Sequence, residues 1–157
     1  MSYDAGTGTV MLFGGDGPVS GGADRLNDTW LLSGSTWIPM APTTAPSARA
    51  LFAMTERSAP HNDVILIGGQ DAGGARLDDT WRWDGGIANW SQITPINSTA
   101  PVTFGGGNEA VYDAVRDVVT IIGGTGTGNA PSTLTGAGSW TSEYDCVANE
   151  WRAYGDD

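Results

Sequence analysis

The sequence predicts an all-β fold built from three copies of one four-stranded antiparallel unit. A Gly-Gly pair recurs at residues 14–15, 68–69 and 123–124, at spacings of 54 and 55 residues, and such recurrence indicates an internal repeat. Each pair closes an apolar run that is too short for a helix. No longer window shows the 3.6-residue periodicity of an amphipathic helix, because Gly and Pro interrupt every candidate.

The composition is that of one folded domain. The chain has 157 residues, of which 39% are hydrophobic and seven are Trp, and this much apolar surface excludes intrinsic disorder. The 24 Gly and eight Pro lack the strict period of collagen. They therefore mark turns between short strands.

The charge excludes several classes of partner. Eighteen acidic residues against seven basic ones give a formal net charge of −11, which disfavours nucleic acids and anionic membranes. All seven basic residues are Arg, so the lysine that phosphate-binding loops and Schiff-base enzymes need is absent. No apolar run reaches 18 residues, so no membrane span is expected. We expect no cofactor.

Metal ligands and nucleophiles are also scarce. Cys146 and His61 are the single residues of their types, which excludes an internal disulfide and multi-histidine or cysteine-rich metal sites. We expect Cys146 to fill space and His61 to be solvated in a hairpin turn. Some aspartates near the Gly-rich loops could line a calcium site, but their spacing is not that of a calcium-binding loop. They are Asp16, Asp24, Asp71, Asp78 and Asp79. We expect no metal and no catalytic residue.

Each unit is expected to begin with a hairpin. The first strands are predicted at residues 2–3, 51–54 and 110–112, and a turn follows each. The second strands are the apolar runs at residues 10–13, 64–67 and 118–122. Because these runs do not alternate with polar residues, they are expected to be buried on both faces. The Gly pairs are expected to take positive φ angles or to allow a close backbone approach.

A Gly-rich loop and two further strands complete each unit. The loops span residues 16–26, 70–77 and 125–139. The third strands follow at residues 27–32, 78–84 and 140–145, with aromatic residues at Trp30, Trp81 and Tyr144. The fourth strands are marked by Trp37, Trp90 and Trp151. Both aromatic positions are expected to fill the space between neighbouring units, because each Trp buries on the order of 200 Å².

The order Gly-Gly, variable loop, Asp-Thr-Trp and second Trp resembles the kelch repeat of bacterial kelch-repeat proteins. Its structural residues are the aromatic residues above and the glycines Gly14, Gly15, Gly68, Gly69, Gly123 and Gly124. The resemblance implies that each unit is a blade of a β-propeller. The blades of this single domain are expected at residues 1–41, 42–97 and 98–157. Arg49 stands where the kelch pattern often carries an Arg, so we expect a structural role for it.

Three kelch-type blades form only a partial propeller, because propellers typically have about four to eight blades. The two end blades are then expected to expose apolar faces to water. Two explanations are open. Either the sequence is a truncated part of a longer protein, or two copies form a homodimer that completes a six-bladed ring.

The variable loops point to a binding role, since loops on a rigid scaffold commonly carry function. Arg25 and Arg76 occupy matching places beside these loops, and a guanidinium suits bidentate recognition of carboxylates. The resemblance adds that related kelch adaptors grip acidic peptides with such arginines. We therefore consider both arginines as ligand-binding residues. The alternative is a structural role in local salt bridges with Asp24, Asp28, Asp78 or Asp79.

These features together predict a non-catalytic kelch-repeat binding scaffold whose loop face engages a protein or carbohydrate partner. The alternative is the scaffold part of a larger carbohydrate-active enzyme, or of a copper-radical oxidase that resembles galactose oxidase. The copper site of such oxidases needs two His, so the catalytic residues of that enzyme would lie outside this chain. The lysine-free composition leans towards an exported bacterial protein, and the compartment stays open.

Overall fold

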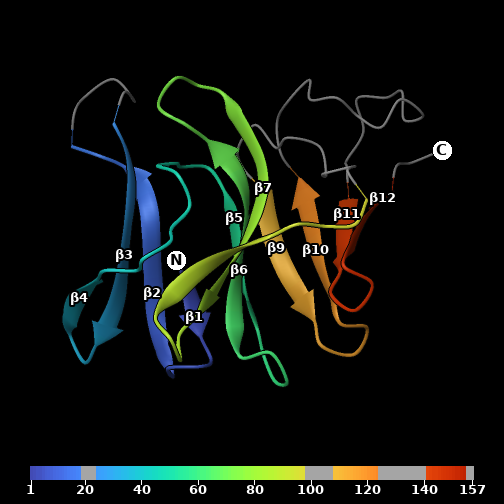
Figure 1. Cartoon of the computed structure of the whole chain (residues 1–157), viewed down its shortest axis with the longest axis horizontal. Coiled ribbons are helices and arrows are strands. Elements are labelled where there is room, and N and C mark those ends of the chain that lie inside the picture. Colours follow the sequence, from blue (N-terminus) through green and yellow to red (C-terminus); the bar gives the residue numbers. More distant parts are fainter. Residues whose placement is uncertain (19–23, 98–107, 124–140, 155–157) are drawn as a thin grey trace.

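The structure is a computed structural model that describes residues 1–18, 24–97, 108–123 and 141–154. It consists of three four-stranded antiparallel sheets, and in each sheet the strands follow one another in chain order (Figure 1). The described residues contain no helix, and hence none that is long and apolar enough to cross a membrane. The predicted all-β class and the repeated four-stranded unit are confirmed.

The strand bounds follow the predicted units closely. The first sheet holds β1 (Ser2–Asp4), β2 (Thr9–Asp16), β3 (Arg25–Ser33) and β4 (Thr36–Met40). The second holds β5 (Ala53–Arg57), β6 (Asp63–Gln70), β7 (Arg76–Asp84) and β8 (Asn89–Ile93). The third holds β9 (Asn108–Asp113), β10 (Val118–Gly123), β11 (Thr141–Asp145) and β12 (Glu150–Tyr154).

The first strand of the second sheet is shifted along the chain from its predicted place. The first strand of the second sheet was expected at residues 51–54, but β5 begins at Ala53 and runs to Arg57. Leu51 has a φ of 59°, and this left-handed conformation cannot continue a strand. The apolar residues of this segment favour a strand in a sequence-based prediction, so the turn at Leu51 was not expected.

The glycine pairs create a bulge near the end of the second strand. The pairing of β2 with β3 shifts between Phe13 and Gly15, and that of β6 with β7 shifts between Ile67 and Gly69. The first two pairs all have positive φ angles, between 49° and 109°, which is the conformation that glycine adopts without strain. The expected positive φ is therefore confirmed at these two pairs. Gly123 ends β10, and Gly124 lies outside the described residues.

A close backbone approach adds a second reason for glycine at position 14. A Cβ atom there would lie 2.7 Å from the carbonyl oxygen of Leu26 and 2.8 Å from that of Arg49. Both oxygens belong to the backbone, which cannot move aside cheaply. The bulge therefore sits where β3 and the segment before β5 meet β2.

The second sheet is packed on both of its faces. Residues alternate between the faces of a strand; along β6, Val64 and Leu66 pack against the first sheet, whereas Ile65 and Ile67 pack against the third. All four are buried. The expectation that this apolar run is buried on both faces is confirmed, because a neighbouring sheet covers each side.

The three sheets converge along their first strands. Strand β5 contacts both β1 and β9, whereas no comparable contact joins the fourth strands of neighbouring sheets within the described ranges. The sheets therefore spread apart from β1, β5 and β9 towards β4, β8 and β12. The turns that join first and second strands are brought together by this arrangement.

The register corrects the alignment of the aromatic residues. Tyr144 pairs with Val119, and Trp83 pairs with the equivalent Val64, whereas Trp81 pairs with Leu66. Trp83, not Trp81, is thus the counterpart of Tyr144. Trp83 is fully buried, while Trp81 is only half-buried. The spacing to the fourth strand agrees with this register, because Trp83 and Tyr144 each lie seven residues before the Trp with which they pair.

The fourth-strand tryptophans also differ from expectation in one sheet. Trp90 and Trp151 are buried between sheets, at 1% and 4% exposure, but Trp37 is 37% exposed. Trp37 lies on the face of the first sheet that points away from the second sheet. No described part of the chain covers that face, so Trp37 fills no space between sheets.

Candidate functional site

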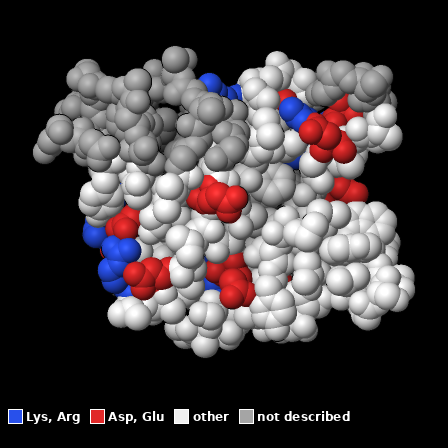
Figure 2. All heavy atoms as spheres, turned by 180° about the vertical axis from the view of Figure 1, so that it is seen from behind, with Lys and Arg blue, Asp and Glu red and all other residues white. Residues whose placement is uncertain are grey.

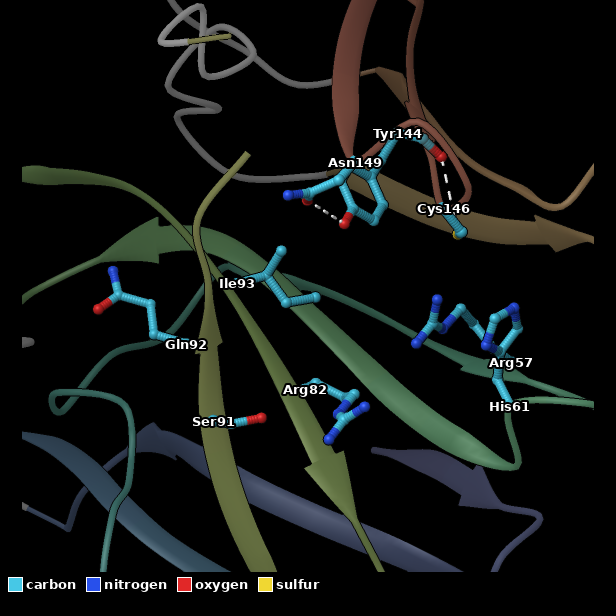
Figure 3. A pocket seen from close by; sticks show the side chains of 9 residues that line it. All are labelled: Arg57, His61, Arg82, Ser91, Gln92, Ile93, Tyr144, Cys146 and Asn149. Atoms are coloured by element: carbon cyan, nitrogen blue, oxygen red, sulfur yellow. Dashed lines mark hydrogen bonds between the residues drawn. The ribbon is translucent and has the colours of Figure 1, made fainter. Parts of the chain in front are cut away.

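A cleft of about 400 Å³ opens between the second and third sheets. The β5–β6 and β11–β12 turns, which lie at the same end of the sheets (Figure 1), contribute His61, Cys146 and Asn149 to the lining of the cleft (Figure 3). Its lining residues are Arg57, His61, Arg82, Ser91, Gln92, Ile93, Tyr144, Cys146 and Asn149. Most of them carry a polar group, although the cleft continues an apolar interface between the same two sheets.

The equivalent space between the first and second sheets holds more apolar side chains, beside the buried Asp4 that takes the place of Arg57. Leu31 and Met40 pack there against the buried core, as does Ala88 from the β7–β8 turn. By the strand register, Arg82 takes the place of Leu31. Asn149 takes the place of Ala88, since each is the positive-φ residue just before a fourth strand. Polar residues thus replace apolar ones in the second instance of the same interface.

A buried ion pair forms one wall of the cleft. Arg57 Nε and Nη2 donate to the two carboxylate oxygens of Asp63, at 2.8 and 2.7 Å. Burial acts to lower the pKa of Arg57, but the hydrogen bonds and charge of Asp63 outweigh it and raise that pKa. The two opposite charges of this pair compensate one another. Asp63 therefore has no oxygen left without a donor.

Arg82 provides a positive charge whose Nε has no hydrogen-bond partner. Its Nε lies 3.9 Å from Asp63 Oδ2, beyond hydrogen-bond distance. This Nε is buried and lacks a hydrogen-bond partner in the described part of the chain, although the side chain as a whole is 42% exposed. Figure 3 shows Arg82 beside Ser91 within the cleft. A guanidinium in this position can donate to an incoming acceptor.

The expectation that His61 is solvated is wrong. Its Nε2 lies 2.8 Å from Asp117 Oδ1, and its ring meets that of Tyr112 edge-on. Burial opposes ionisation of Asp117, but hydrogen bonds from Tyr112 and His61 outweigh it and lower the pKa of Asp117. The expectation failed because the converging first strands bring the β5–β6 turn against the β9–β10 turn.

Cys146 and Tyr144 stay protonated in the cleft. Burial raises the pKa of the Cys146 thiol to about 11 and that of Tyr144 to about 12. The Tyr144 hydroxyl donates to Asn149 Oδ1 at 2.7 Å. Neither group is a ready nucleophile at neutral pH.

Alkylation of Cys146 by iodoacetamide at pH 8 should be on the order of 100-fold slower than that of an exposed cysteine, because the thiolate fraction falls with a raised pKa. Mass spectrometry over a time course measures the rate. In urea the difference should vanish. Equal rates for the folded and unfolded chain at pH 8 would contradict the raised pKa.

The loop arginines singled out from the sequence lie at the other end of the sheets. Arg25 begins β3 and Arg76 begins β7, next to the β2–β3 and β6–β7 loops (Figure 1). Arg25 forms an ion pair with Asp16 and donates to Gln70 Oε1 at 3.5 Å. Its partner is thus Asp16 rather than Asp24 or a neighbouring aspartate. The third Gly-rich loop, residues 125–139, lies outside the described residues.

The candidate calcium ligands do not gather. Asp79 binds Arg49 and Asp16 binds Arg25. In the ranges that the structure describes, no three side chains of His, Cys, Asp or Glu lie close enough to hold a metal.

Sequence reasoning missed Arg82, Ser91 and Asn149 as cleft residues. They can be recognised only when the units are aligned by strand register, because Arg82 then occupies the position that Leu31 has in the first unit. That register depends on the bulge and on strand pairing. No protein-family model matches this sequence, and no curated protein matches it.

Proposed function

We propose that this chain is a non-catalytic binding module whose sheets are blades of a kelch-type β-propeller. Three features support this architecture: sheets of four strands in chain order, convergence along the first strands, and bulges at the glycine pairs. Stacked sheets that share one core are the arrangement by which propeller blades bury both faces.

The observation that carries the binding role is the replacement of an apolar filling by a polar cleft. Between the first and second sheets, Leu31 and Ala88 pack where Arg82 and Asn149 line the cleft. Between the second and third sheets, Arg82 and its polar neighbours leave about 400 Å³ open. A concave site with a few convergent polar groups is typical of a ligand site.

The ligand group that fits best is a carboxylate. Arg57 is neutralised by Asp63, so Arg82 supplies the charge that is left, and a guanidinium binds carboxylates bidentately. Ser91, Gln92 and Asn149 add hydrogen-bonding groups, while Ile93 lines the cleft with an apolar side chain. Both an acidic side chain of a partner protein and an acidic sugar of a glycan carry this group.

A binding role is favoured over catalysis by the state of the titratable groups. Raised pKa values keep Cys146 and Tyr144 protonated. His61 Nε2 is engaged by Asp117, and Figure 3 shows Ser91 on the opposite side of the cleft from His61. No side chain of the cleft combines a free nucleophile with an adjacent base.

Replacing Arg82 with glutamine should weaken binding of an acidic ligand by roughly 10- to 100-fold, since a hydrogen bond to a charged group contributes about 1.5–3 kcal/mol. Isothermal titration calorimetry with two probes, a glutamate tripeptide and digalacturonate, measures the loss and separates the two sources of the carboxylate. A glutamine tripeptide with blocked ends, which carries no carboxylate, should not bind.

The matched controls are Arg25→Gln and Arg76→Gln, which remove the same charge at the loop end of the sheets. Both should leave the affinity unchanged if the cleft is the site. An affinity that falls in these variants but not in Arg82→Gln would move the site to the loop face. Failure of the wild-type chain to bind either probe would reject the carboxylate cleft.

A further inference from the structure

Two interfaces between neighbouring sheets are built on the same plan. In the first, Met11 and Phe13 of the first sheet pack against Val64, Leu66, Trp83 and Trp90 of the second. In the second, Ile65 and Ile67 of the second sheet pack against Val119, Ile121, Tyr144 and Trp151 of the third. One face of each sheet therefore meets the opposite face of the next.

A Trp–Thr hydrogen bond joins the first two sheets. Trp90 Nε1 donates to Thr29 Oγ1 of the preceding sheet at 3.0 Å, in a buried position. By strand register, Trp151 and Thr80 occupy the equivalent positions at the second interface, but Trp151 Nε1 and Thr80 Oγ1 are buried without a hydrogen-bond partner in the described residues. The two residue positions recur at both interfaces, whereas the hydrogen bond is present at the first.

The outer face of the first sheet is equivalent to the faces that carry Trp90 in the second sheet and Trp151 in the third. Residues alternate along β2, so Val10 and Leu12 point away from the second sheet, as do Leu32 and Trp37 through their cross-strand pairing. These four are the counterparts of Val64, Leu66, Trp83 and Trp90. Trp37 and Tyr3, which lie on the two edge strands of this sheet, are 37% and 49% exposed.

The outer face of the third sheet is equivalent to the faces that carry Thr29 in the first sheet and Thr80 in the second. Ile122 is the counterpart of Phe13 and Ile67, and its cross-strand partner Thr141 is the counterpart of Thr29 and Thr80. Ile122, Val111 and Tyr154 are about half exposed on this face. Thr120 stands where the other sheets have Met11 and Ile65, while the adjacent Val111 is apolar where β5 has Thr55. On this face the apolar side chain therefore comes from β9, whereas in the other two sheets it comes from the second strand.

We propose that a second copy of this chain covers both outer faces, with the first sheet of each copy packed on the third sheet of the other. Trp37 of one copy then takes the place over Thr141 that Trp90 takes over Thr29. The contact continues an interface that the chain already contains twice. Because the sheets fan out from their first strands, head-to-tail packing curves the assembly, and two copies close it as a ring of six sheets.

The charges on the outer faces are compatible with this contact. Figure 2 shows mixed charges along the side of the third sheet, whereas the side of the first sheet is largely uncharged away from its loop end. Arg116 pairs with Asp113 and Glu143 at 2.7 and 2.9 Å, so its positive charge is shared by two carboxylates of the same copy. They lie in the place that the cleft occupies between the second and third sheets.

Sedimentation equilibrium of the 157-residue chain should give twice the chain mass of 16.3 kDa. Trp37→Asp and Ile122→Asp alter one outer face each, and each variant alone should lose the dimer mass. Ile87→Asp places the same charge on an exposed turn residue of neither face and should stay dimeric.

Mixing the two variants tests the head-to-tail arrangement and also their folding. An equimolar mixture of Trp37→Asp and Ile122→Asp should regain the dimer mass, because one intact pair of faces remains, with weaker association than the wild type. A contact between like faces predicts instead that one variant stays dimeric on its own. That result, a monomeric wild type, or a mixture that stays monomeric would overturn the proposal.

Discussion

Replacing Arg49 with methionine should lower the free energy of unfolding by about 3–5 kcal/mol, the loss observed when one partner of a buried ion pair is removed. Arg49 is fully buried and forms a two-pronged ion pair with Asp79 in β7, with the Nη2–Oδ2 bond at 2.8 Å. It also donates to the carbonyl oxygen of Gly68 at 2.9 Å. Its removal takes the Arg49 donor from Asp79 and from Gly68, and leaves Asp79 with the hydrogen bond from Trp81 Nε1.

The backbone of Arg49 explains why the effect should reach beyond one sheet. Its carbonyl accepts from the amide of Gly15, and its amide donates to the carbonyl of Leu26. The backbone thus pairs with the first sheet while the side chain holds the second. Urea denaturation measures the change. Arg116→Met is the control, because Arg116 is 54% exposed and exposed ion pairs contribute only about 0–1 kcal/mol.

The effect of Arg49→Met should also depend on pH. Burial acts to raise the pKa of Asp79, but hydrogen bonds from Arg49 and Trp81 outweigh it and lower that pKa. A carboxyl whose pKa is lower in the folded state stabilises the fold above its unfolded pKa of about 3.9. This stabilisation is lost as the pH falls through the folded pKa. The difference between wild type and variant should therefore shrink below about pH 4, and a constant difference would contradict the pair.

Replacing Gly14 with alanine should destabilise the fold by roughly 2–5 kcal/mol. A left-handed backbone costs an alanine about 1–2 kcal/mol, and overpacking adds about 1–3 kcal/mol. Gly14 has a φ of 49°, and its Cβ would press on backbone oxygens of Leu26 and Arg49. Thermal and urea unfolding measure the loss.

The control for this variant is Gly34→Ala. Gly34 has a similar φ of 61°, but no atom lies within 4 Å of its Cβ position. Its substitution should therefore cost only the backbone strain of about 1–2 kcal/mol. Equal losses in the two variants would show that the close approach at Gly14 contributes nothing.

The strand pattern was predictable because it depends on local features. The apolar run at residues 64–67 predicts burial on both faces whichever sheets cover it. The Gly-Gly pairs predict a backbone that other residues avoid. Both inferences need only neighbouring residues, and both hold in the structure.

Burial of the fourth-strand tryptophans could not be predicted from the residues around them in sequence. Trp37 and Trp90 carry the same signal in sequence, yet only Trp90 is buried. Burial of a fourth-strand Trp requires another sheet in front of it. No property of the residue itself supplies that sheet.

Local sequence accounts for the strands, the turns and the bulged glycines, because φ preferences and alternation act between residues close in the chain. The side chains that line the cleft depend instead on how the sheets pack together. Arg57, Arg82 and Asn149 come from strands and turns of two sheets, and His61 meets Asp117 across 56 positions of the chain. Such contacts arise from the angle at which the sheets converge, and that angle results from packing of the whole core.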